Sequence, residues 1–106
     1  MEFLNRVELV GVVGSIRKQK VSDQTVANFS VVTEQYYKDK SGRAVVEATW
    51  FNIVAWQNNN MPDLERIDRG SHVHIQGRIR VRRYTSESGE PRSTFEVVAT
   101  NVQLQS

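Results

Sequence analysis

Four arginines and a tyrosine lie close together in the segment 78–84. Alternate side chains of a strand share a face, so a strand here would present a row of cations that ends in an aromatic ring. That row is Arg78, Arg80, Arg82 and Tyr84. Ile79 and Val81 would face the core, and Arg83 adds one more cation. A solvated edge strand protected by charge is the alternative, but no carboxylate lies among these arginines, so the row predicts phosphate contacts.

A second basic segment, 36–43, holds two tyrosines followed by a hairpin signal. Asp39-Lys40-Ser41-Gly42 is typical of a turn in which Gly42 adopts a positive φ. Neighbouring strand residues point to opposite faces, so we expect one of Tyr36 and Tyr37 to pack on the core. The basic side chains near the turn are suited to gripping a flexible polyanion. The expected phosphate contacts in this segment are Lys38, Lys40 and Arg43.

Two tryptophans lie six residues apart in the run 50–56. As a strand, this run places Trp50 and Trp56 on one face together with Asn52. The opposite face carries Phe, Ile and Ala, an ordinary core pattern. We therefore expect both tryptophans to be partly exposed, and stacking on nucleic-acid bases is a good reason for two exposed tryptophans on one sheet face.

Catalytic and metal chemistry have no visible support. His72 and His74 would share a strand face, but the chain has no further histidine and no cysteine to complete a metal site. No pair of carboxylates lies in an apolar run that would raise a pKa for acid–base work, and no phosphate-binding glycine loop is present. We expect a protein that is not an enzyme and that uses no metal and no cofactor.

The hydrophobic pattern has a period of two over most of the chain, which indicates strands. The strand-like runs cover about 7–13, 25–37, 45–56, 71–84 and 93–104. Gly11, Gly14 and Gly77 interrupt them where bends are expected. The segment 61–69 predicts a short helix between the third and fourth strands. This order predicts an all-β fold, a five-stranded OB-fold barrel with antiparallel strands.

Length and composition fit one small domain covering residues 1–106. The 106 residues are 39% hydrophobic, which suffices for one modest core, and the net charge is only +2. No run approaches the roughly 20 apolar residues that a membrane span needs, and the N-terminus does not resemble a signal peptide. The absence of cysteine is compatible with a reducing cytoplasm, so we expect a cytoplasmic, nucleoid-associated protein that does not contact a membrane.

Several stretches, in order along nearly the whole chain, resemble the bacterial single-stranded DNA-binding protein family. They include NRVELVGVVG, VANFSVVTE, YYKDKSG, TWFNIVAW, RGSHVHIQGRIRVRRY and EVVATNVQL. The resemblance implies an OB-fold that assembles as a homotetramer. It also implies sequence-independent binding and protection of single-stranded DNA in replication, recombination and repair. The stacking positions it implies are Tyr37, Trp50, Trp56 and Tyr84.

The sequence departs from that family in three places. Phe51 follows the first tryptophan where the family has a subunit-contact histidine, which leaves a dimer as the alternative to a tetramer. Gln57-Asn58 replaces the usual Gly-Lys. The sequence ends at Gln105-Ser106 without the family's acidic C-terminal tail, so we do not expect these 106 residues to recruit repair or replication enzymes.

Two other binding modules remain open on the sequence. One is a primosomal accessory OB-fold protein, a dimeric interaction module that holds a helicase on DNA. The other is an OB-fold that binds an oligosaccharide, which would have no need of the arginine row. The four aromatic residues favour single-stranded DNA binding over the accessory protein, and the arginine row favours it over oligosaccharide binding.

Overall fold

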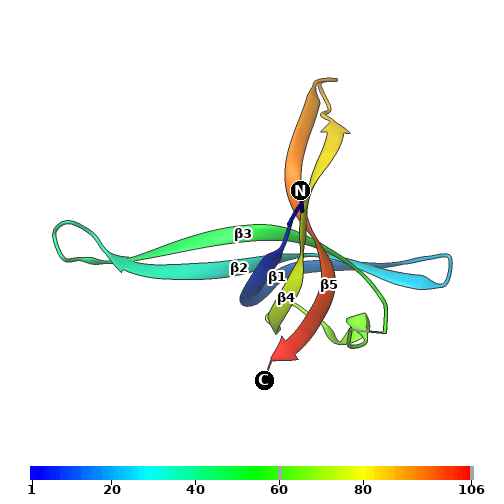
Figure 1. Ribbon diagram of the computed structural model, residues 1–106, viewed down its shortest axis with the longest axis horizontal. Coiled ribbons are helices and arrows are strands. Elements are labelled where there is room, and N and C mark those ends of the chain that lie inside the picture. Colours follow the sequence, from blue (N-terminus) through cyan, green and yellow to red (C-terminus); the bar gives the residue numbers. More distant parts are fainter. Residues whose placement is uncertain (60, 106) are drawn as a thin grey trace.

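Five long strands form a closed barrel in the computed structural model, which describes residues 1–59 and 61–105 (Figure 1). The strands are β1 (Val7–Val21), β2 (Gln24–Lys38), β3 (Ala44–Trp56), β4 (His72–Thr85) and β5 (Pro91–Gln105). Their order around the barrel is β1-β2-β3-β5-β4. In the described part of the chain, no helix is long and apolar enough to cross a membrane.

One seam of the barrel is parallel. β3 pairs with β5 in the same direction through Ile53, Val54 and Ala55, while all other described strand pairs are antiparallel. The sequence-based expectation of an entirely antiparallel barrel is therefore wrong at this seam. The reason is the connection after β3, which carries the chain to β1, so that β4 pairs with β1 and β5 returns beside β3.

Glycines lie where neighbouring strands approach most closely. The register shifts between Val13 and Ile16 in β1 and between Gln76 and Gly77 in β4, as the glycine pattern predicted. A Cβ atom on Gly11 would overlap the carbonyl oxygen of Val32, and a Cβ atom on Gly77 would overlap that of Val98. These two positions therefore accept only a residue without a side chain.

Side-chain hydrogen bonds help to hold the segment between β3 and β4. The helix expected over 61–69 is only a 3₁₀ turn, Leu64–Arg66. The Gln57 side chain supplies hydrogen bonds that a longer helix would have made within its backbone. Its Oε1 accepts from the Leu64 N–H at 2.8 Å, and its Nε2 donates to the Pro62 carbonyl at 2.9 Å. Leu64 and Ile67 are fully buried, so one tight turn is enough to bring both into the core.

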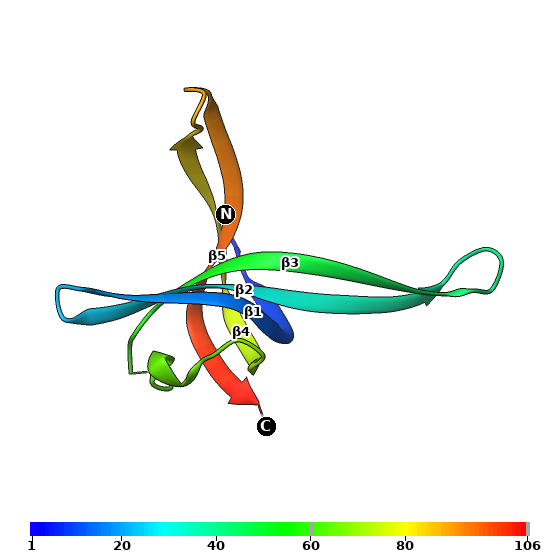
Figure 2. The ribbon, with the colours of Figure 1, turned by 180° about the vertical axis from the view of Figure 1, so that it is seen from behind.

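Three hairpins extend beyond the barrel (Figures 1 and 2). The β2–β3 hairpin, in cyan and green, extends away on one side, and the β1–β2 hairpin, in blue, extends on the other. The β4–β5 hairpin, in yellow and orange, projects roughly across them. Because the core lies within the barrel, both faces remain open to contacts at the tips of these hairpins.

Phe29 tests the position of the core. It is 4% exposed inside the barrel, so Phe29→Ala should lower the free energy of unfolding by about 3–5 kcal/mol through the cavity it leaves. Phe95→Ala is the matched control, because Phe95 is 69% exposed. Chemical denaturation of both variants would contradict this core assignment if the two losses were equal.

Candidate nucleic-acid interface

Four aromatic side chains expected to stack on bases are exposed on the strands. The exposed fractions are 50% for Tyr37, 59% for Trp50, 40% for Trp56 and 46% for Tyr84. Trp50 and Trp56 share one face of β3, and six residues of strand separate their backbones by about 20 Å. Both tryptophans are thus partly exposed, as their spacing predicted, and each presents ring surface on which a base can stack.

Both tyrosines near the end of β2 are exposed, so the expectation that one would pack on the core is wrong. Tyr36 is 74% exposed. The pairing of β2 with β3 runs without a shift from Val26 to Lys38, which puts Tyr36 on the face of Trp50 and Tyr37 on the opposite face. Neither ring reaches the core because the hairpin extends past the barrel at this point. Tyr36 is therefore a further stacking candidate that sequence reasoning did not select.

Gly14 of β1 supports the ring of Trp50. A Cβ atom at this position would overlap Cζ3 of the indole and would lie 2.7 Å from its Cη2. The ring therefore lies directly against the glycine backbone while more than half of the side chain stays exposed. Ser30 borders the same spot, and its hydroxyl accepts from the Ser15 N–H at 3.0 Å.

The cations of the β2–β3 hairpin surround an ordered turn. Asp39 Oδ1 accepts from the backbone N–H groups of Ser41 and Arg43, both at 2.9 Å, and from the Ser41 hydroxyl at 2.7 Å. These hydrogen bonds, that of the Ser41 hydroxyl first, lower the pKa of Asp39 below its ordinary value. Gly42 has the expected positive φ of 82°. The turn thus holds the backbone at Lys40 and Arg43 and follows Lys38, the last residue of β2.

The arginine row of β4 differs in two respects from the sequence interpretation. Arg80 is not free of carboxylates, because Glu96 lies opposite it on β5 and accepts from its Nε at 3.0 Å. Ile79 and Val81 are not buried in the core, since each is 44% exposed. Val81 lies on the hairpin beyond the β3–β5 seam, whereas Ile79 pairs with Val97 at that seam. Among the described residues, Arg78, Arg82 and Arg83 form no ion pair.

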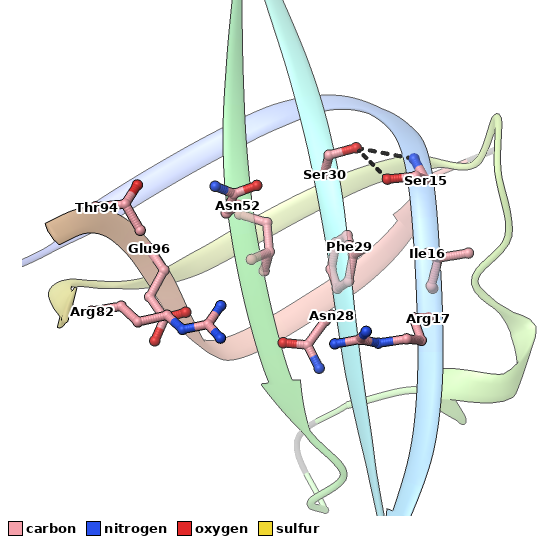
Figure 3. Close-up of a pocket in the computed structure, with 11 residues that line it drawn as sticks. Ser15, Ile16, Arg17, Asn28, Phe29, Ser30, Asn52, Arg82, Thr94 and Glu96 are labelled. Atoms are coloured by element: carbon pink, nitrogen blue, oxygen red, sulfur yellow. Dashed lines mark hydrogen bonds between the residues drawn. The ribbon is translucent and has the colours of Figure 1, made fainter. Parts of the chain in front are cut away.

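A polar cleft of about 300 Å³ lies between the β1–β2–β3 face and the β4–β5 hairpin (Figure 3). Its polar lining comprises Ser15, Arg17, Asn28, Ser30, Asn52, Arg82, Thr94 and Glu96. Sequence reasoning selected only Arg82 from this set. Arg17 and Asn28 are directly opposite each other in the β1–β2 register, a relation that appears only once that register is known.

The two histidines do not join the cleft. His74 Nε2 lies 2.7 Å from Glu8 Oε2 on the neighbouring strand β1. This hydrogen bond, followed by that from Gln76, lowers the pKa of Glu8. The part of the chain that the structure describes contains no cluster of three or more groups that could hold a metal ion.

Gly14→Ala tests the support of Trp50. The φ of Gly14 is not positive, so alanine is strained only by the neighbouring side chains, and we expect a loss of about 1–3 kcal/mol in the free energy of unfolding from overpacking. In a Trp50→Ala background the same substitution should cost far less, because the indole is gone. A double-mutant cycle by denaturation measures this coupling, and an unchanged cost in the second background would contradict the contact.

Comparison with known proteins adds evidence independent of this geometry. The model of the Single-strand binding protein family matches residues 4–105. Single-stranded DNA-binding protein 1 of Chlorobaculum tepidum is 32% identical in an alignment 106 residues long, which covers 95% of this chain and 64% of that protein. Single-stranded DNA-binding protein 3 of Streptococcus agalactiae is 33% identical over 104 residues, covering 96% of this chain and 74% of that one.

The chain spans 64% and 59% of the lengths of the Chlorobaculum tepidum protein and of a Neisseria meningitidis relative. Among solved structures, the Plasmodium falciparum SSB in complex with ssDNA has a TM-score of 0.83 at 22% identity, covering 100% of this chain and 98% of that one. The small single-stranded DNA-binding protein of Streptomyces coelicolor has a TM-score of 0.71 at 18% identity, covering 97% of this chain and 96% of that one. These structures share the OB-fold predicted from the strand order. With its family model matched over nearly its whole length, this chain belongs to the single-strand binding protein family.

Proposed function

We propose that this chain binds single-stranded DNA without sequence preference and protects it during replication, recombination and repair, with no catalytic step of its own. The observation that carries the proposal is the set of exposed aromatic rings on strands that also carry unpaired cations. The proposed stacking residues are Tyr37, Trp50, Trp56 and Tyr84, and Tyr36 is an additional candidate. The similar proteins of Chlorobaculum tepidum and Streptococcus agalactiae are single-stranded DNA-binding proteins, which supports the same activity.

Stacking favours a single strand over a duplex. Each base offers a π-face to an aromatic side chain only when it is not stacked within a helix, and every base has such a face. The cations can follow the phosphates without reading the bases. They are Lys38, Lys40, Arg43, Arg78, Arg80, Arg82 and Arg83. Arg80 contributes least to this set, since Glu96 already neutralises it. We therefore infer that the protein is associated with the DNA of the bacterial nucleoid.

A free strand edge supports self-assembly. The residues from Val7 to Gly11 pair with β4, whereas the described pairs of β1 with β2 begin only at Val12. Val10 is 59% exposed on this part of the strand, and the preceding Phe3 and Leu4 are almost fully exposed. An unpaired edge next to apolar surface can pair with a second copy of the same chain. We infer a homotetramer, with a dimer as the alternative.

Trp56→Ala tests the stacking proposal. Loss of one base–aromatic contact should weaken binding to a single-stranded homopolymer by about 1–3 kcal/mol, with the melting temperature nearly unchanged. Tyr37→Ala and Tyr84→Ala should behave in the same way. Fluorescence titration with poly(dT) and poly(dA) measures the affinities, and strong quenching of the wild-type tryptophans is expected with both polymers.

Two results would contradict the proposal. One is a preference of the wild-type chain for duplex DNA. The other is unfolding of the Trp50→Ala and Trp56→Ala variants while the remaining folded fraction binds normally, which would mean that these rings are structural. Val21→Ala removes an exposed apolar side chain at the far end of β1, outside the proposed set, and should leave the affinity unchanged.

Sedimentation at micromolar concentration tests the assembly. A tetramer is the expected species, and Val10→Lys should shift it toward smaller species because a charge is introduced beside the free edge. Val21→Lys is the matched control, since Val21 is also exposed but lies at the far end of β1. A wild-type monomer would contradict the assembly, and a stable dimer would favour the primosomal accessory alternative.

A further inference from the structure

We propose that Arg17, Arg82 and Asn28 form a single phosphodiester-binding subsite between Trp50 and Trp56. The inference rests on the proposed binding of single-stranded DNA and names the group of the ligand that this cleft would hold. Neither Arg17 nor Asn28 belongs to the set of residues that the sequence motifs select.

The strand register places these side chains between the two tryptophans. In the β2–β3 register, Ser30 lies opposite Asn52 and Asn28 lies opposite Val54. These two cross-strand pairs lie on the face of the tryptophans, between Trp50 and Trp56. They carry no aromatic ring. A DNA strand that stacks on both tryptophans, whose backbones are about 20 Å apart, must therefore cross a stretch that offers it only polar and small apolar groups.

Two guanidinium groups reach this stretch from opposite sides (Figure 3). Arg17 extends from β1 toward Asn28, its partner in the register. Arg82 extends from the β4–β5 hairpin toward the same place, and both arginines line the cleft. Guanidinium groups present several N–H donors in a plane, an arrangement suited to phosphate oxygens.

The donors of the subsite are unoccupied within the described chain. Arg17 and Arg82 form no ion pair there, and the side-chain amide of Asn28 makes no hydrogen bond there. Arg80 provides the contrast, because it is held by Glu96. Two unpaired cations in one cleft repel each other, and an anion bound between them would offset this repulsion.

Glu96 also lines the cleft, and its charge has to be accounted for. Its side chain is only 11% exposed, and Oε1 accepts from both Nε and Nη2 of Arg80, at 3.0 and 2.5 Å. These two charge-assisted hydrogen bonds neutralise the carboxylate and hold it against the hairpin. Arg17 and Arg82 therefore remain as the uncompensated charges of the cleft, which favours an anionic ligand over a cationic or neutral one.

A phosphodiester fits this subsite better than a base edge. Every donor that converges there is an N–H of a guanidinium or an amide, and each can point to a phosphate oxygen whatever the base sequence. The subsite would thus fix the backbone between two stacked bases without adding sequence preference. Because both arginines would hold the same phosphate, their contributions to binding should not be independent.

Charge removal tests the subsite on the intact chain. Arg17→Gln and Arg82→Gln should each weaken binding to oligo(dT) about tenfold, the effect of losing a hydrogen bond to a charged group. The slope of log affinity against log salt should become shallower by about 0.7 in the double variant, because one phosphate contact is lost. Arg69→Gln is the matched control, since this exposed arginine lies outside the cleft.

The outcomes separate the subsite from the overall function. An unchanged affinity and slope in the double variant, or changes no larger than those of Arg69→Gln, would overturn the subsite while wild-type binding still supported the proposed function. A slope loss of about 1.4 in the double variant would mean two separate phosphates and would also overturn it. Absence of wild-type binding would refute the function itself.

A strand of abasic deoxyribose phosphate distinguishes the phosphate from the base. The double variant should bind this strand more weakly than the wild-type chain by the same factor as it does oligo(dT), because the lost contact is to the backbone. If the difference between the two proteins disappears on the abasic strand, the arginines contact bases and the phosphodiester assignment is wrong. Equal melting temperatures of all variants would show that folding is unaffected.

Discussion

Strand β1 pairs with two different strands, β4 and β2, and the rest of the structure depends on where it changes partner. Its first half pairs with β4 and its second half with β2, with the change of partner at Val12. The change requires a close backbone approach at Gly11 and a register shift just after Val13. The same bend leaves room for the ring of Trp50 on Gly14. Closing the barrel and placing a tryptophan on its surface are therefore consequences of one constraint.

The β3–β5 seam that closes the barrel is short, while the β2–β3 pairing is long. Only three residue pairs form the β3–β5 seam, yet β2 and β3 pair continuously for their whole shared length. Beyond the seam the hairpins have no core to cover. Side chains at their ends therefore stay exposed on both faces, which explains why Tyr36 and Tyr37 are both accessible and why Val81 is not buried.

Alternation along single strands could be read from the sequence, and relations between strands could not. The faces of Trp50 and Trp56, the core position of Phe29 and the turn at Gly42 follow from local pattern, and all appear as expected. The partner of Arg80 does not, because Glu96 is sixteen residues away and meets it only through the β4–β5 register. The helix was overestimated because a three-residue spacing of apolar side chains fits a 3₁₀ turn as well as an α-helix.

The arrangement divides the proposed contacts between the barrel and its hairpins. Trp50, Trp56 and the polar cleft lie on the barrel, where the β2–β3 register fixes the spacing of the two tryptophans. Tyr37 and Tyr84 lie on separate hairpins that extend away from it in different directions (Figure 1). A polymer seated on the barrel would therefore have a defined central path and could meet further aromatic rings along either hairpin. Binding of this kind depends on the length of the ligand more than on its sequence, because each added contact is a backbone charge or a π-face that every nucleotide supplies.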